Sequence, residues 1–300
     1  MANAPTFSIF DCKTPLPDTS IAEHAKKLLG FDKRYKRIHN QLQLLLRLDE
    51  LPKWSTDHHG VILPVCSQIS EQYPLVIFHG DVGTGKTTTA ECIANRIVTE
   101  ANAKDSMLFK LSNRVRGSGK VGEMGTLLAD AFNKLSEYVG KKRRAILIID
   151  EGDSIAATRT QKQSHHEDKV AVNTLIQSID SLRKFGGRIL TILCTNRLSI
   201  VDAALQRRAT IVEEFSRPTE RERAQLLNQD LDGVRLTREQ LAELVRLTGP
   251  LNGAPTWTFS DITTRLYPAA VGRAFPNRPL SFDDLKVAAL SITPAPIMEN

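Results

Sequence analysis

One stretch decides the fold of this 300-residue chain, and it reads Leu75-Val-Ile-Phe-His-Gly-Asp-Val-Gly-Thr-Gly-Lys-Thr87. Its first four residues are all apolar, which is typical of an inner strand of a parallel sheet with both faces covered. The remainder fits the pattern Gly-x4-Gly-Lys-[Ser/Thr], a loop whose backbone amides surround a polyphosphate. Glycines permit the turns that this loop needs, and the following helix would direct its positive N-terminal end at the phosphates. The stretch therefore predicts an α/β fold that binds a nucleotide.

The loop residues have expected roles. Lys86 is expected to reach the β- and γ-phosphates, and Thr87 to hold Mg²⁺. Nucleotide contacts are expected from Asp81, Val82, Gly83, Thr84, Gly85, Lys86, Thr87 and Thr88. An ordinary glycine-rich turn is the alternative, but a buried strand before the loop and a helix after it argue against that interpretation.

A second motif, Asp150-Glu151, ends the apolar run of residues 145–149. Magnesium bound by the first motif needs a carboxylate at a neighbouring strand end, and Asp150 is expected to supply it, through water. Glu151 would orient or deprotonate the attacking water. A protein that only binds nucleotide does not need Glu151, so its presence favours hydrolysis.

Three further candidates lie downstream of this motif. Asn196 follows another apolar strand and could hydrogen-bond the γ-phosphate or the attacking water, although it could equally cap the turn. Arg207 and Arg208 lie near a predicted subunit edge. An arginine offered there to the γ-phosphate of a neighbouring copy would stabilise the transition state.

The order of elements predicts an α/β domain followed by a helical one. Strands are expected at 75–79, 107–111, 145–150, 188–195 and 210–215, with helices between them at 87–101, 121–139 and 168–184. After residue 217 only helix signals remain: capping boxes at Thr219 and Thr237, and possible helix starts at Ser260 and Ser281. We expect an N-terminal arm and helical segment over 1–54, a large domain over 55–217 and a small all-helical domain over 218–300. The proline-containing end at 294–296 is expected to fray.

Composition excludes several classes of protein. Hydrophobic residues make up 41% and charged residues 25%, as in soluble globular chains, and no run is long enough to cross a membrane. Four cysteines at unrelated spacings argue against disulfides or a zinc site and favour a cytoplasmic location. The net charge is +6, and six basic residues cluster at Lys26, Lys27, Lys33, Arg34, Lys36 and Arg37. A solvated helix face explains them most simply, and a patch for an acidic partner or a phosphate backbone is the alternative.

Together the motifs at 80–87, Asp150-Glu151, Asn196 and Arg207-Arg208, followed by a helical lid, resemble those of an AAA+ ATPase. The resemblance is greatest to the pachytene-checkpoint, thyroid-receptor-interactor-type remodellers, and four stretches carry it: 78–87, 149–159, 172–180 and 208–211. It implies an AAA+ P-loop NTPase sheet flanked by helices, with ATP and Mg²⁺ as cofactors. It also implies a homo-hexamer that partly unfolds a HORMA-domain protein. The short N-terminal region resembles the bacterial branch, which acts beside cGAS-like nucleotidyltransferases in anti-phage systems.

The same resemblance implies a substrate pore loop, comprising Arg114, Val115, Arg116, Ser118, Gly119 and Lys120. The family's aromatic residue is replaced here by Arg114 and Val115, which offer less contact area, so the loop would hold its substrate more weakly or favour acidic substrate. An ordinary mobile loop is the alternative. A second pore loop could lie at 159–168, where His165-His166 lacks further ligands for a metal. In the lid, Asp261-Ile262 replaces the family's Gly-Arg, and Arg265 is the best substitute for its sensor arginine.

Two other function classes stay open. One is a DNA-associated AAA+ ATPase of the clamp-loader or transposition-helper type, which the basic charge permits, although we expect neither nucleic acid nor a membrane as a partner. The other is a nucleotide-gated scaffold without turnover, which conflicts with Glu151. No motif marks the residues that recognise adenine, and we expect them near 57–63 and at the lid junction.

Overall fold

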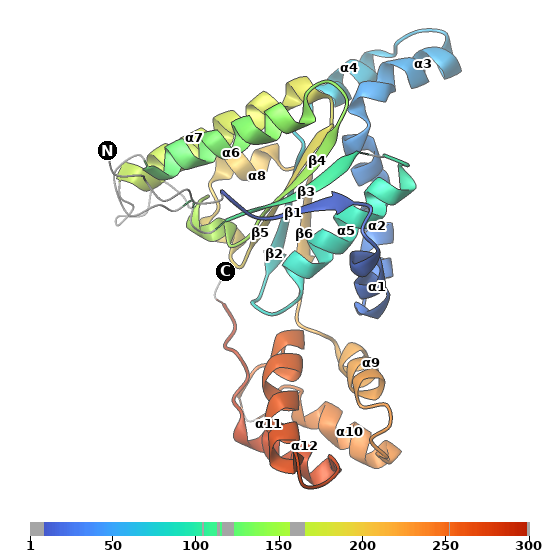
Figure 1. Cartoon of the computed structure of the whole chain (residues 1–300), viewed down its shortest axis with the longest axis vertical. Helices are drawn as coiled ribbons and strands as arrows, with labels where there is room; N and C mark the ends of the chain where they lie inside the picture. The colour runs from blue at the N-terminus through green and yellow to red at the C-terminus, as the bar shows by residue number, and fades with distance from the viewer. Residues whose placement is uncertain are drawn as a thin grey trace. The chain divides into compact units, whose positions relative to one another are not determined.

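In the computed structural model, β2 (Leu75–Gly80) leads through the glycine-rich loop into α5 (Lys86–Glu100), as the sequence predicts (Figure 1). The structure describes residues 9–103, 105–112, 115, 123–156, 166–251 and 253–298. The chain divides into two compact units. The first comprises the residues up to His79 together with Thr87–Glu213, and the second comprises Gly80–Lys86 and the residues from Glu214 onward. The N-terminal segment is thus part of the same unit as most of the sheet.

The described residues form a six-stranded sheet in the order β1-β3-β4-β5-β2-β6. Besides β2, its strands are β1 (Phe10–Leu16), β3 (Ser106–Leu111), β4 (Arg144–Ile149), β5 (Ile189–Thr195) and β6 (Ile211–Phe215). Strands β2, β5, β4 and β3 pair in parallel. Every residue of β5 is buried, because both of its faces are covered. The five predicted strands are confirmed to within one residue at each end.

The sixth strand, β1, corrects the expectation of an N-terminal arm, because residues 10–16 belong to the sheet. It pairs antiparallel with β3 at the edge of the sheet, and the Phe10 ring lies 4.9 Å from that of Phe109. Pro15 interrupts its pattern, and an edge strand tolerates proline because one side of its backbone has no strand partner. The pairing partner is almost a hundred residues away, so no local signal marks this strand.

Helices cover both faces of the sheet. One core contains buried residues of α6 (Glu123–Val139), α7 (His166–Leu182) and α8 (Ala203–Arg208), packed against the strands. Helix α5 lies on the other face with α1 (Thr19–Lys27) and α2 (Phe31–Leu46) (Figure 1). The Asn95 amide of α5 exchanges two hydrogen bonds with the backbone of Asp18, the residue that caps α1. Two short helices, α3 (Leu51–His59) and α4 (Pro64–Ser70), precede β2.

The second unit is helical beyond β6, as predicted. It contains α9 (Glu220–Asp230), α10 (Arg238–Leu247), a π-helical turn (Asp261–Leu266), α11 (Tyr267–Ala274) and α12 (Phe282–Ser291). Capping boxes begin α9 at Thr219, α10 at Thr237 and α12 at Ser281. Ser260 does not cap a helix, because Thr258 does: its hydroxyl accepts from the Asp261 amide and its own amide donates to the Asp261 carboxylate, both at 3.0 Å.

No helix in the described part of the chain is long and apolar enough to cross a membrane. The four cysteines are free thiols, and three of them are buried.

Candidate nucleotide-binding site

The loop between β2 and α5 has the backbone that its glycines permit. Gly80, Gly83 and Gly85 have φ values of +138°, +75° and +87°. A Cβ on Gly80 would lie 2.1 Å from the carbonyl oxygen of Phe215, and one on Gly83 would lie 2.7 Å from the Cβ of Ser260. Gly80 and Gly83 are therefore required both for the left-handed backbone and for close packing.

Lys86 is held inside the loop that it ends. Its side chain donates from Nζ to the carbonyl oxygens of Gly80 and Asp81, each at 2.8 Å, and the residue is 7% exposed. The Thr84 hydroxyl donates to the same Asp81 carbonyl, also at 2.8 Å. These bonds fix the ammonium group within the glycine-rich loop, which is where a polyphosphate would meet it.

Thr87 and Asp150 come together at the carboxyl end of the sheet. Thr87 lies in the first turn of α5, and Asp150 directly follows β4. The Thr87 hydroxyl donates to Asp150 Oδ2 at 2.8 Å. A hydroxyl and a carboxylate are hard oxygen donors, which Mg²⁺ prefers, so this pair fits the ion that the sequence assigns to it.

Glu151 is exposed beside this pair and has a φ of +49°. Such a conformation is uncommon for a residue with a side chain, and strained residues of this kind cluster at functional sites. The Glu151 amide donates to Asp150 Oδ1 at 2.9 Å, and its carbonyl accepts from the Ser154 hydroxyl at 2.7 Å. These two bonds fix the backbone of Glu151, and water can reach its side-chain carboxylate.

Asn196 follows β5 at the same edge of the sheet, because β4 and β5 are parallel and Ile149 lies opposite Leu193. Sequence reasoning did not find its neighbour Asp153. The Asp153 Oδ1 accepts from the Thr195 hydroxyl at 3.3 Å and from the Asn196 amide at 3.4 Å. This carboxylate fixes the backbone that presents Asn196. The only signal for Asp153 in the sequence was its position three residues after Asp150.

The two candidate arginines differ in their surroundings. Arg208 makes a two-point ion pair with Asp180 of α7, and its guanidinium lies 5.1 Å from the centre of the Tyr73 ring. The hydrogen bonds to Asp180 raise the pKa of Arg208. Arg207 is exposed on α8. Of the two, Arg207 has the more exposed side chain.

Arg265, the predicted lid arginine, donates to Asp261 at 3.1 Å and is 45% exposed. Asp261 is buried and also accepts from the hydroxyl and amide of Thr258. Burial raises the pKa of the Asp261 carboxyl, but hydrogen bonds from Thr258, Ala295 and Arg265 outweigh it, and the net pKa lies below the ordinary value. Both arginine and aspartate belong to the π-helical turn, a feature that is frequent at functional sites.

Five of the six predicted pore-loop residues lie outside the described residues: Arg114, Arg116, Ser118, Gly119 and Lys120. Most of the second candidate loop, including His165, does so too. The sixth residue, Val115, is 1% exposed and belongs to the apolar core beneath α6 and α7. The expectation that Val115 contacts a substrate is therefore wrong, since a side chain buried in the core has no surface to offer.

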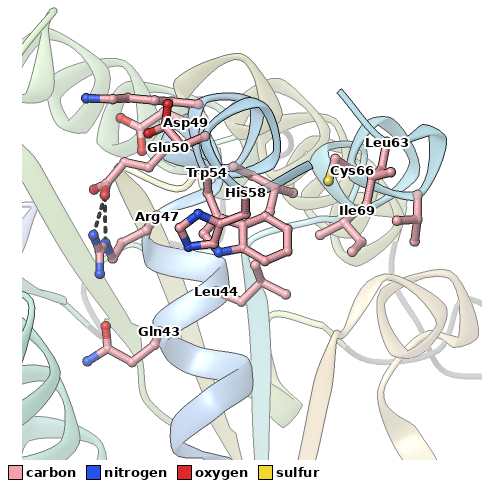
Figure 2. Close-up of a pocket in the computed structure, with 14 residues that line it drawn as sticks. Gln43, Leu44, Arg47, Asp49, Glu50, Trp54, His58, Leu63, Cys66 and Ile69 are labelled. Carbon is pink, nitrogen blue, oxygen red and sulfur yellow. Dashed lines mark hydrogen bonds and ion pairs between the residues drawn. The ribbon is translucent and has the colours of Figure 1, made fainter. Parts of the chain in front are cut away.

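The segment expected near adenine lies elsewhere. Asp57, His58 and Leu63 line a groove of about 920 Å³ formed by α2, α3 and α4 (Figure 2). Helix α4 precedes the first residue of β2, so the groove lies at the amino edge of the sheet, whereas Thr87 and Asp150 lie at the carboxyl edge (Figure 1). The expectation for 57–63 is wrong, because β2 lies between this segment and the phosphate loop and separates them by the length of a strand.

The basic cluster on α1 and α2 is only partly a solvated face. Arg34 Nε lies 3.4 Å from a carboxylate oxygen of Glu213, and Arg37 pairs with the same oxygen. Glu213 is 6% exposed within β6, and an unpaired charge there would be costly. Two of the six basic residues therefore neutralise a buried acid, which weakens the case for a phosphate-backbone patch.

Comparison with known proteins shows which family the chain belongs to. The family model for "ATPase family associated with various cellular activities (AAA)" matches residues 76–217, which contain the loop, Asp150, Asn196 and both arginines. CD-NTase-associated protein 6 of Escherichia coli strain KTE188 is 61% identical over 291 residues, covering 97% of this chain and 98% of that protein.

Solved structures agree. A chain of the HORMA:CdnC:Trip13 complex of E. coli MS115-1 has a TM-score of 0.87 and 34% identity, with 97% of each chain covered. Rhizobiales Trip13 has a TM-score of 0.69 and 28% identity, covering 95% of this chain and 99% of that one. The phosphate-loop pattern, the hydrogen bond between Thr87 and Asp150 and these similarities agree: the chain belongs to the AAA ATPases, in the family of CD-NTase-associated protein 6.

Proposed function

We propose that this ATPase partly unfolds a HORMA-domain protein and thereby regulates a cGAS-like nucleotidyltransferase in an anti-phage system. Two similarities support the proposal. The relative that is 61% identical is named for its association with a CD-NTase, and 97% of this chain matches a chain of a HORMA:CdnC:Trip13 complex. Because both matches extend over nearly the whole chain, they include the lid as well as the nucleotide-binding motifs.

The chemical part of the proposal is Mg²⁺-dependent hydrolysis of ATP. The observation that supports it is the 2.8 Å hydrogen bond between Thr87 and Asp150, which brings together a hydroxyl and a carboxylate, the oxygen donors that Mg²⁺ prefers. When bound there, the ion would neutralise charge on the β- and γ-phosphates. The loop amides and Lys86 would bind and orient the phosphates. Glu151 would accept the proton of the attacking water, and Asn196 would position that water or the γ-phosphate.

A homo-hexamer would complete this site. Arg207 is exposed while Arg208 is held by Asp180, which supports a role for Arg207 at the γ-phosphate of a neighbouring copy. Four free cysteines suit a reducing compartment, and we place the protein in the cytoplasm.

The test uses Glu151→Gln, which should bind ATP without turning it over. Tagged Glu151→Gln protein, with ATP present, is expected to capture a HORMA-domain protein from extracts of its own cells, identified by mass spectrometry. Lys86→Ala is the matched control, because it should not bind ATP and should capture nothing specific. The proposal fails if both variants capture the same proteins, or if Glu151→Gln hydrolyses ATP at the normal rate.

A further inference from the structure

Asp81, the second residue of the phosphate loop, makes different bonds with its backbone and its side chain. Its carbonyl oxygen accepts from Lys86 and Thr84, as described above. Its carboxylate accepts from Arg217 Nε at 2.6 Å and from the backbone amide of Met298 at 3.0 Å. One residue thus connects the ammonium group that would meet the phosphates to the start of the lid and to the C-terminal segment.

Arg217, between β6 and α9, uses its whole guanidinium group. Besides Asp81, it donates from Nη1 to the carbonyl oxygen of Thr256 at 2.6 Å and from Nη2 to that of Pro296 at 2.7 Å. The side chains of Arg217 and Asp81 are only 10% and 15% exposed. A planar guanidinium can reach three acceptors in fixed directions, which a lysine cannot do from one ammonium position.

The C-terminal segment 294–298 is fixed at three points. The Ala295 amide lies 3.2 Å and 3.3 Å from the two carboxylate oxygens of Asp261, and the Met298 amide bonds to Asp81. Arg217 bonds to Pro296 between them. The expectation that 294–296 frays is therefore wrong, because acceptors and donors distant in the sequence satisfy its backbone.

The pair also has an electrostatic consequence. The loop serves a ligand with several negative charges, and Asp81 adds a carboxylate to that loop. Charges in a largely buried position are screened less than charges in water, so an unpaired Asp81 would repel the polyphosphate. The guanidinium of Arg217 neutralises the carboxylate at direct contact.

We propose that Arg217 is a positioning residue for the nucleotide. It neutralises the Asp81 carboxylate and bonds to the C-terminal segment, so that nucleotide affinity depends on the neutralisation of Asp81 and on the segment. The inference rests on the ATPase site alone and does not require a HORMA-domain partner. A wild-type chain that bound no ATP would contradict the ATPase function itself, whereas differences in affinity between the variants concern only Arg217 and Asp81.

The test measures the affinity of the full chain for a fluorescent, non-hydrolysable ATP analogue with Mg²⁺. Arg217→Ala should weaken binding about tenfold. Asp81→Asn alone should bind at least as tightly as the wild type, because it removes the repelling charge and keeps the backbone carbonyl that accepts from Lys86 and Thr84. The double variant Arg217→Ala/Asp81→Asn should recover to within about threefold of the wild type, and Arg217→Lys should fall between the wild type and Arg217→Ala.

If Arg217 only stabilised the fold, Asp81→Asn would not preserve nucleotide affinity and the double variant would not recover it. If Asp81→Asn weakens binding as much as Arg217→Ala, or if the double variant is no better than Arg217→Ala, the proposal is overturned. Unchanged affinity in Arg217→Ala overturns it as well. Should Arg217→Ala not fold, the affinity of Asp81→Asn still tests whether the Asp81 charge opposes nucleotide binding. Removal of residues 294–300 then decides the role of the segment, since it should weaken binding several-fold and unchanged affinity would contradict the proposal.

Discussion

Arg208 and Asp180 form a two-point ion pair that joins α8 to α7, with Nε 2.5 Å from Oδ1 and Nη2 2.9 Å from Oδ2. The pair links two of the stretches on which the family resemblance depends, 172–180 and 208–211. It also distinguishes two adjacent arginines, Arg207 and Arg208, whose roles the sequence alone does not tell apart. Arg208 is committed to its own chain, and Arg207 is exposed beside it.

Substitution should distinguish these two arginines. Arg207→Ala should lower the ATPase rate by about a thousandfold while leaving ATP binding and thermal stability unchanged, because a neighbour's arginine acts on the transition state. Arg208→Ala should instead destabilise the chain by about 1 kcal/mol, as expected for a partly exposed pair. Steady-state ATPase assays and melting curves on both variants provide the comparison. Loss of turnover in Arg208→Ala at full stability, with Arg207→Ala active, would reverse the assignment.

Removal of the Thr87 hydroxyl should raise the magnesium requirement of the reaction. Thr87→Ala deletes one of the two paired oxygen donors, and we expect the Mg²⁺ concentration for half-maximal ATPase activity to rise at least about tenfold. Thr87→Ser keeps the hydroxyl and serves as the control. Identical magnesium titrations for Thr87→Ala and the wild type would show that the hydrogen bond to Asp150 does not mark a metal site.

The buried carboxyl of Asp261 should make part of the stability depend on pH. Its pKa lies below the ordinary value, so folding favours the ionised form. Its contribution is therefore complete above the ordinary pKa and is lost as the pH falls through the depressed one. Asp261→Asn should cost about 1–3 kcal/mol at pH 7, measured by urea unfolding. The difference from the wild type should narrow below about pH 4. A difference that stays constant down to pH 3 would argue against this account.

The groove between α2 and α4 should not affect nucleotide binding. Trp54 and Asp57 line this groove, which lies at the amino edge of the sheet. Trp54→Ala and Asp57→Ala are each expected to bind the ATP analogue within about twofold of the wild type, with Lys86→Ala as the positive control for loss. A large loss in either variant would restore the original expectation for residues 57–63.

Local signals in the sequence were sufficient to predict the strands β2 to β6, the phosphate loop and the starts of α9, α10 and α12. An apolar run, a glycine pattern and a capping box each act over a few neighbouring residues, so β2, α5 and the cap at Thr219 could be predicted from their own letters. Thr87 and Asp150 could also be paired in advance, because parallel strands end at one edge of a sheet.

The remaining features depend on partners far away in the chain. Sequence reasoning missed β1 because its pairing partner is β3, and it missed Arg217 because Asp81 and Pro296 lie 136 and 79 residues away. The choice between Arg207 and Arg208 depends on Asp180, 28 residues earlier. By itself, the sequence determined which chemistry the chain carries and the elements that present it. Only the tertiary structure decided which charges neutralise one another, because an ion pair depends on a distance in space that residue order does not specify.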